Sequence, residues 1–247
     1  MRNIKVTIAY DGTNYHGFQE QRGTRLPTIQ GVLQQELSRL SKNEIIVTAA
    51  GRTDAGVHAK GQVINFVADK WQIPIDRVVP ALNSVLPKDI CALAAEEVDP
   101  FFHARFAAVA KTYKYYIYND IVPSPFWRLY SYHYKGYLDL EQMQKAAAYL
   151  IGEHDFCSFM AAGSPVKSTV RTLYELKLER KDKLIVLSFH GNGFLYNMVR
   201  IITGTLIEVG IGKYGPGDLK QILEGRNRKL AGPTAAASGL FLEKVYY

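Results

Sequence analysis

The chain has 247 residues, of which 47% are apolar and 21% charged, and its formal net charge at pH 7 is +7. These values are typical of a soluble globular protein and disfavour a disordered, collagen-like or coiled-coil chain. No apolar run approaches the ~18 residues of a membrane-spanning helix, and the N-terminus lacks the apolar core of a signal peptide.

The first part of the chain alternates strand and helix patterns. Residues 3–10 alternate between apolar and polar side chains and lead into Asp11-Gly12, a pair typical of turns. Thr28 is suited to cap a helix, because the apolar residues from Ile29 to Leu40 follow helical spacing. The remaining predictions are strands at 44–50 and 61–67, a helix at 75–86 that contains Pro80, and a segment at 90–98 that fits a strand or a helix.

The second part opens with a tyrosine-rich strand pattern over residues 105–119. Asp139, followed by Gln142, resembles a capping box at the start of a helix that extends to Leu150. The other elements predicted here are strands at 170–179 and 183–190, a buried helix at 194–209, a short helix at 217–225 and a closing strand at 240–246.

Each half therefore follows the order strand, helix, strands, helix, and the two halves open on similar sequences. We expect an α+β fold of two related domains, residues 1–105 and 106–247, that share a sheet. The repeat is weak in sequence, and taken alone it is also compatible with chance.

The positive charge is concentrated in the second half. Residues 1–105 hold 12 basic and 11 acidic side chains, whereas residues 106–247 hold 18 and 12. A basic half that is also rich in aromatic side chains suits a polyanion with bases that can stack. A protein that is basic without binding nucleic acid is the alternative.

Cys91 and Cys157 are the only cysteines and form no C-x-x-C pair. Their number and spacing indicate neither a disulfide framework nor a zinc site. Two reduced thiols fit a cytoplasmic protein.

A polar loop between two predicted strands is the strongest candidate for chemistry. In it, Gly51 and Gly56 bracket Arg52 and Asp54, and glycines permit tight turns and the close approach of a ligand. An arginine two residues away can keep the Asp54 carboxylate ionised, which suits a nucleophile or base. The alternative is a plain turn in which Asp54 caps the backbone and Arg52 faces solvent.

The stretch Gly51 to Ala59, continuing into Gly61-Gln62-Val63, resembles the signature of the TruA-class tRNA pseudouridine synthases. The match is long and of low degeneracy, and other segments resemble the same family in the same order along essentially the whole chain. These segments are Tyr10-Asp11-Gly12-x-x-Tyr15-x-Gly17-Phe18-Gln19, Phe102-His103-Ala104-Arg105-Phe106, Lys111-Thr112-Tyr113-Lys114-Tyr115, His154-Asp155-Phe156-x-Ser158-Phe159, Gly193-Phe194-Leu195-Tyr196-Asn197-Met198-Val199-Arg200 and Gly239-Leu240-Phe241-Leu242.

The resemblance implies an enzyme that converts uridines just 3′ of the tRNA anticodon to pseudouridine, as a cytoplasmic homodimer without metal or cofactor. It also implies a fold of two α/β-sandwich-like domains in one extended, mostly antiparallel sheet. Helices would cover one face, and a basic cleft would lie between the domains.

The resemblance also assigns roles to individual residues. The catalytic aspartate corresponds to Asp54, with Arg52 as its neighbour in the motif, and the arginine that pairs with that carboxylate corresponds to Arg200. Tyr113 corresponds to the tyrosine at the target base, and Leu240 is a second expected substrate-binding residue.

Tyr113 and Arg200 each have a structural alternative. A strand tyrosine usually packs between sheet and helix, although a ring beneath an extruded base would gain about 1–3 kcal/mol from stacking. A lone arginine on an apolar helix either reaches solvent along its own stem or finds a buried acid.

Several other features receive no role in the chemistry. Residues 210–215 spell G-x-G-x-x-G but follow a helix pattern, so a dinucleotide site is not expected. His58 and His103 fit structural hydrogen bonding better than metal ligation. The basic cluster of Arg226, Arg228 and Lys229 fits a solvated turn, with a contact to the tRNA backbone as the alternative.

Three functions remain to be compared. The leading hypothesis is a tRNA-modifying isomerase, because the family resemblance implies one. A non-catalytic RNA-binding or RNA-chaperone protein on the same scaffold would need neither Asp54 nor Arg200. A hydrolase would need a second acid that the sequence does not place.

Overall fold

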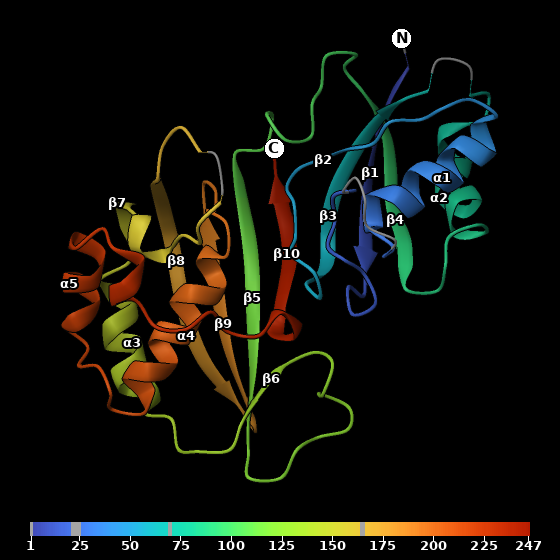
Figure 1. Cartoon of the computed structure of the whole chain (residues 1–247). Helices are drawn as coiled ribbons and strands as arrows, with labels where there is room; N and C mark the ends of the chain where they lie inside the picture. The colour runs from blue at the N-terminus through green and yellow to red at the C-terminus, as the bar shows by residue number, and fades with distance from the viewer. Residues whose placement is uncertain (1, 21–25, 69–70, 164–165) are drawn as a thin grey trace. The chain divides into compact units, whose positions relative to one another are not determined.

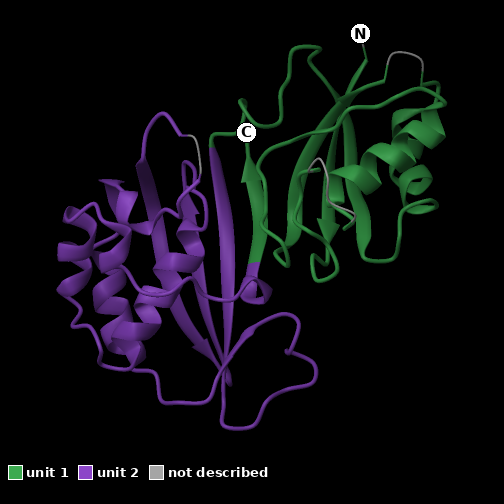
Figure 2. Cartoon of the chain, in the orientation of Figure 1, with its two compact units in different colours: residues 1–109, 241–247 green, residues 110–240 purple. Residues whose placement is uncertain are grey.

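The computed structural model describes residues 2–20, 26–68, 71–163 and 166–247 (Figure 1). The chain forms two compact units, residues 1–109 with 241–247 and residues 110–240 (Figure 2). The closing residues therefore pack with the first unit. The sequence predicts two domains divided after residue 105. That each of them folds on its own stays a prediction.

The first unit is a sheet with two helices in the order β-α-β-β-α-β. Strands β3 and β4 both pair antiparallel with β1, the short β2 pairs antiparallel with β3, and β10 adds a parallel pairing to β3. The elements are β1 (Asn3–Tyr10), α1 (Ile29–Ser41), β2 (Thr48–Ala49), β3 (His58–Val67), α2 (Ile75–Asn83), β4 (Ile90–Val98) and β10 (Leu240–Tyr246), of which all but Leu240 belong to this unit.

Alternating burial explains the sheet of the first unit. Ile4, Val6 and Ile8 of β1 are fully buried, as period two requires of a strand with one face on the core. Thr28 caps α1 as predicted, since its side chain accepts a hydrogen bond from the backbone N–H of Gly31 at 3.2 Å. Pro80 lies inside α2 and is exposed, and the helix ends at Asn83, three residues earlier than expected.

Of the strand predicted at 44–50, only the two residues of β2 form a strand, because the residues before them bond to a helix. The backbone N–H groups of Ile45 and Val47 donate to the side chains of Ser38 and Gln34 on α1, at 2.9 and 3.0 Å. Bonds to a helix replace the bonds to a neighbouring strand over this stretch. The ambiguous segment at 90–98 is a strand, because it pairs along its length with β1.

The second unit is an antiparallel sheet in the order β5-β9-β8-β7, with β6 parallel to β5. Helix α3 packs against α4 and β8. The elements are β5 (Ala110–Asn119), β6 (Tyr132–Tyr134), α3 (Leu140–Ala148), β7 (Gly152–Asp155), β8 (Val170–Lys181), β9 (Leu184–Gly191), α4 (Met198–Gly210) and α5 (Asp218–Glu224).

Two helix starts in the second unit test the sequence patterns. Asp139 caps α3 as predicted, accepting from the backbone N–H of Gln142 at 3.1 Å. The buried helix expected from residue 194 begins only at Met198, because Asn197 has a left-handed backbone with a φ of 59°. Residues 192–197 are therefore a loop.

The two units repeat one connection pattern. In the second unit β5, α3, β8, β9 and α4 follow the order of β1, α1, β2, β3 and α2, and in both units the later central strand pairs antiparallel with the opening one. The α+β class is confirmed. Strands β6 and β7 of the second unit have no counterpart in this shared order, and two related domains stay a prediction. No helix within the described residues has the length and apolar character needed to cross a membrane.

Candidate active site

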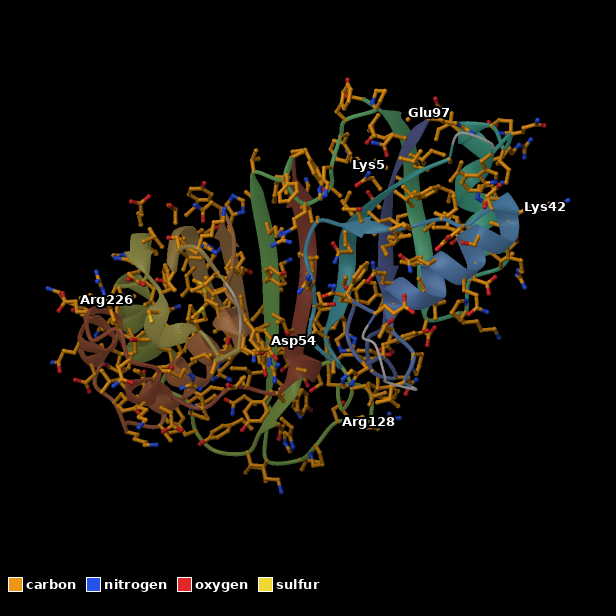
Figure 3. All side chains as sticks on the ribbon, turned by 45° about the horizontal axis from the view of Figure 1, so that its top comes forward. Lys5, Lys42, Asp54, Glu97, Arg128 and Arg226 are labelled. Carbon is orange, nitrogen blue, oxygen red and sulfur yellow. The ribbon has the colours of Figure 1, made fainter. Side chains whose placement is uncertain are left out.

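Asp54 lies in the loop that connects β2 to β3 and is labelled in Figure 3. The start of this loop is fixed to β3: the Ala50 N–H donates to the carbonyl of Val63, and the side chain of Gln62 donates to the carbonyl of Gly51, each at 2.8 Å. Within the loop, the Val57 N–H donates to the carbonyl of Asp54 at 3.1 Å, closing a turn. Asp54 itself is half-buried.

The segment after β1 wraps around the Asp54 loop. The Phe18 N–H donates to the carbonyl of Thr53 at 3.0 Å, and the Gly56 N–H donates to that of Tyr15 at 3.4 Å. Gly17 has a φ of +81°, and a Cβ there would lie 2.8 Å from the Thr53 carbonyl oxygen. A Cβ on Gly12 would lie 2.0 Å from the Val57 oxygen. Only glycine permits this approach of two backbones.

Tyr10 forms a buried contact with Thr53, the residue before Asp54. Their hydroxyl oxygens lie 2.7 Å apart, and Tyr10 is 4% exposed. Burial raises the pKa of Tyr10 to about 12, while hydrogen bonds to Thr53 and Gln62 partly oppose that shift. The phenol therefore stays neutral at physiological pH and holds the residue that precedes Asp54.

Arg52 and Asp54 share a loop but lie in different environments. Arg52 is exposed and makes no ion pair or hydrogen bond with another described residue. Its solvent-facing position matches the structural alternative for this residue. A role for Arg52 in the chemistry stays a prediction.

His58 and His103 both make structural contacts in the first unit. The Nδ1 of His58 accepts from the Gly12 N–H at 3.1 Å, and the buried ring stacks on Phe241 at 4.5 Å. His103 accepts from the backbone N–H of Arg105 at 3.2 Å. Among the described residues, no group of three or more His, Cys, Asp or Glu side chains could hold a metal ion.

The other candidate residues lie in the second unit. Tyr113, on β5, is 8% exposed, and its ring meets Phe194 edge-on at 5.0 Å between centroids. Tyr113 occupies the same face of β5 as Tyr115 and Ile117, which are fully buried. Tyr113 is therefore largely buried, as the structural alternative for a strand tyrosine expects.

Arg200 is fixed by two contacts in the first turn of α4. Its Nε donates to the carbonyl of Ala235 and its Nη1 to the side chain of Asn197, both at 2.8 Å. Asn197 therefore holds the arginine and does not cap the helix with its side chain. The half-buried guanidinium is oriented by protein groups and does not simply extend to solvent.

Two glycines of the second unit, Gly204 and Gly239, allow close contacts between neighbouring segments. A Cβ on Gly204 would lie 1.8 Å from the Pro233 carbonyl oxygen, so this glycine allows residues 233–236 to lie against α4. A Cβ on Gly239 would lie 2.6 Å from the Tyr115 ring, and the next residue, Leu240, is 6% exposed. Leu240 is therefore mostly buried where β10 begins.

The structure adds residues to those that the sequence singled out. The Asp54 loop is held by Tyr10, Gly17 and Gln62. From the sequence, the motif from Tyr10 to Gln19 supports only the family resemblance. Its two glycines are the sequence signal that could have revealed a close backbone approach. The segment 210–215 begins at the last residue of α4 and follows no strand, so it is not a dinucleotide fingerprint.

Comparison with known proteins completes the description. Residues 6–107 and 146–247 match the family described as tRNA pseudouridine synthase. The chain is 49% identical over 247 residues to the tRNA pseudouridine synthase A of Acetivibrio thermocellus, covering 100% of both chains. It is 51% identical to that of Moorella thermoacetica over 244 residues, 99% of both chains, and 48% identical to that of Bacillus subtilis over 246 residues, 99% of this chain and 98% of the relative. The chain therefore belongs to the tRNA pseudouridine synthase family.

Proposed function

We propose that this protein isomerises uridine to pseudouridine in the anticodon stem-loop of tRNA, at uridines just 3′ of the anticodon. The observation that carries the proposal is the position of Asp54. This half-buried carboxylate lies on a loop that hydrogen bonds from β3 and from the segment after β1 hold in place. Full-length similarity to curated tRNA pseudouridine synthases supports the reaction and the class of substrate.

The reaction needs a single well-placed carboxylate. It breaks the bond between N1 of uracil and C1′ of ribose and forms a bond from C5 of the same uracil to C1′. The proton on C5 is lost and N1 gains one, so no oxidant, reductant or second substrate is consumed. In this proposal Asp54 acts as nucleophile on the sugar or base, or as the base that removes a sugar proton.

Arg200 and Tyr113 complete the proposed site. Arg200 is oriented by Asn197 and Ala235, and we assign it as the cation that pairs with the Asp54 carboxylate. Tyr113, supported by Phe194, would contact the target base, with Leu240 as an apolar neighbour of the substrate. Arg52, exposed and two residues before Asp54, is proposed as a catalytic residue on the same loop.

The target uridine must leave its stack to reach the carboxylate, at a cost of a few kcal/mol. Aromatic contact and phosphate contacts by basic side chains would offset that cost. The excess of positive charge in residues 106–247, 18 basic against 12 acidic side chains, supports binding of a polyanion. We further propose a cytoplasmic homodimer that needs no metal or cofactor, in line with the family resemblance.

The test is conversion of an unmodified tRNA transcript, with the pseudouridine positions read by sequencing after carbodiimide treatment. Wild-type protein should form pseudouridine in the anticodon arm without added metal, and Asp54→Asn should form none while still binding the tRNA. A wild-type protein that binds tRNA and leaves every uridine unchanged would favour the non-catalytic RNA-binding alternative. Free uracil among the products would favour a hydrolase.

A further inference from the structure

Arg171 is a half-buried arginine on β8. Its Nη1 donates to the carbonyls of Ser168 and Val170, at 3.0 and 2.5 Å. Its Nε and Nη2 have no partner within the described residues. Two carbonyls thus fix the plane of the group, and the Nε–Nη2 edge presents two parallel N–H donors.

The charge of Arg171 is not compensated by any acid in the part of the chain that the structure describes. Some other arginines do have carboxylate partners, such as Arg2 with Glu97 at 2.7 Å and Arg226 with Asp155 at 3.3 Å. No carboxylate among the described residues lies within ion-pair distance of Arg171. Burial lowers the pKa of Arg171, as expected for a cation taken partly out of water without a counter-charge. An external anion would supply the missing partner.

Gly193 lies beside the Nε atom of Arg171. A Cβ at position 193 would lie 3.5 Å from the Arg171 Nε and 3.6 Å from its Cδ. A side chain at this position would therefore begin in van der Waals contact with Arg171. The loop that contains Gly193 is fixed to β8, because the Asn192 N–H donates to the Thr172 carbonyl at 3.0 Å and the Asn192 side chain accepts from the Thr172 N–H at 2.9 Å.

This loop also connects Arg171 to Tyr113. The residue after Gly193 is Phe194, whose ring meets Tyr113 at 5.0 Å between centroids. Arg171 lies on the same face of the sheet as Leu173, a core residue. Tyr113 is opposite Phe189, another core residue, and therefore occupies that face as well. The free guanidinium edge and the proposed base-contacting tyrosine thus flank one short loop of the second unit.

We propose that the Nε–Nη2 edge of Arg171 binds a backbone phosphate of the RNA close to the uridine that contacts Tyr113. The inference rests on the proposed function, because it takes Tyr113 as the site of the target base. A guanidinium edge matches two phosphate oxygens bidentately. Such a contact fixes the register of the strand without reading its sequence. Arg171 is thus a positioning residue for the reaction.

The experiment compares Arg171→Gln with Arg171→Lys, both in an Asp54→Asn background so that the RNA is bound and not converted. The matched control is Arg180→Gln, because Arg180 lies on the same strand, is exposed and bonds to Asn119 at 3.1 Å. Affinity for an unmodified tRNA transcript is measured over a series of salt concentrations. The same proteins are then tested on anticodon-arm RNAs, each carrying one uncharged methylphosphonate linkage.

We expect Arg171→Gln to weaken binding about tenfold at low salt and to reduce the slope of log affinity against log salt by about 0.7–0.9, the value of one phosphate contact. One methylphosphonate position should weaken binding of the parent protein and have no effect on Arg171→Gln. Arg171→Lys should retain most of the slope and only part of the affinity, because an ammonium lacks the fork. Arg180→Gln should leave both unchanged.

Other results would overturn the inference. One such result is an unchanged salt slope in Arg171→Gln, together with methylphosphonate effects equal to those on the parent protein at every position. Arg171 would then be a structural residue that only holds Ser168 and Val170 in place. If Arg171→Gln does not fold, Arg171→Lys provides the test. A bidentate contact would be excluded if this variant bound every RNA of the methylphosphonate series as tightly as the parent protein does. Failure of the proposed function is separate, since it would appear as absence of pseudouridine with the wild-type protein.

Discussion

The phenol of Tyr10, at the end of β1, lies 2.7 Å from the hydroxyl of Thr53, the residue before Asp54. This bond joins two segments 43 residues apart in sequence and is fully enclosed by protein. It makes the position of the proposed catalytic loop dependent on the first strand. The consequences can be measured in activity, in alkaline stability and in the tolerance of nearby glycines.

Replacing Tyr10 by Phe should lower kcat for pseudouridine formation severalfold while leaving the protein folded. The change removes one buried hydrogen bond and leaves the Thr53 hydroxyl without that partner, at a cost of about 1–3 kcal/mol in the free energy of unfolding. Stability is measured by urea denaturation and kcat by tritium release from C5-labelled tRNA.

Tyr15→Phe is the matched control for Tyr10→Phe. It also removes a phenol hydrogen bond, the one from Tyr15 to Asp89 at 2.7 Å, but that bond does not involve the Asp54 loop. Its kcat should match the wild type although stability falls. Equal losses of kcat in the two variants would show that Tyr10 acts through general stability and not through the loop.

The same residue predicts a loss of stability at alkaline pH. Because the pKa of Tyr10 is raised from 10.0 to about 12 by burial, the folded protein keeps a proton that the unfolded chain has already released between these values. The free energy of unfolding should therefore be unaffected by this group below pH 10. Above pH 10 it should fall by up to about 1.4 kcal/mol per pH unit.

Urea titrations at several values between pH 9 and pH 12 measure this dependence. Tyr10→Phe should show a shallower decline than the wild type. A decline should remain in that variant, because burial also raises the pKa of Tyr15, Tyr115 and Tyr247. Identical slopes for the two proteins would mean that the phenol of Tyr10 ionises equally easily in the folded and unfolded states.

Gly17→Ala should lower stability and kcat by more than the strain of its left-handed backbone alone explains. Gly17 and Gly212 have nearly the same φ, +81° and +78°, but a Cβ at Gly17 would lie 2.8 Å from the Thr53 carbonyl, whereas nothing lies within 4 Å of one at Gly212. Gly212→Ala should cost about 1–2 kcal/mol of stability and leave kcat unchanged. Gly17→Ala should cost about 1–3 kcal/mol more and lower kcat. Equal effects of the two alanines on stability and kcat would contradict the close approach.

The elements that the sequence predicted best are those controlled by neighbours in the chain. The caps at Thr28 and Asp139 depend on a residue three positions ahead, and both are present as expected. The start of α4 was placed four residues too early, because the apolar run from Phe194 does not reveal the left-handed backbone at Asn197. The short β2 depends on side chains of α1, which no local pattern contains.

In the candidate site too, residues within contiguous motifs were predicted, whereas the residues that support them were not. Asp54, Tyr113 and Arg200 were found because they lie in contiguous motifs that resemble a family. The supports of these residues come from distant segments: Tyr10 reaches Thr53, Ala235 reaches Arg200, and Gly193 lies against Arg171. Contacts between segments so far apart in sequence leave no periodicity or spacing by which the sequence alone could show them.

Asn197 provides the sharpest test of how Arg200 is positioned. Its side chain accepts from the Arg200 Nη1 at 2.8 Å, and its φ of 59° is one that glycine adopts without strain. Asn197→Gly should therefore preserve the backbone and release the guanidinium, lowering kcat about tenfold through misplacement of the charge with little change in tRNA affinity. Asn197→Asp retains an acceptor at the same place and should restore most of the rate. If the glycine variant matches the wild type in kcat, the Asn197 side chain does not position Arg200. If aspartate is as slow as glycine, the amide acts on something other than the arginine.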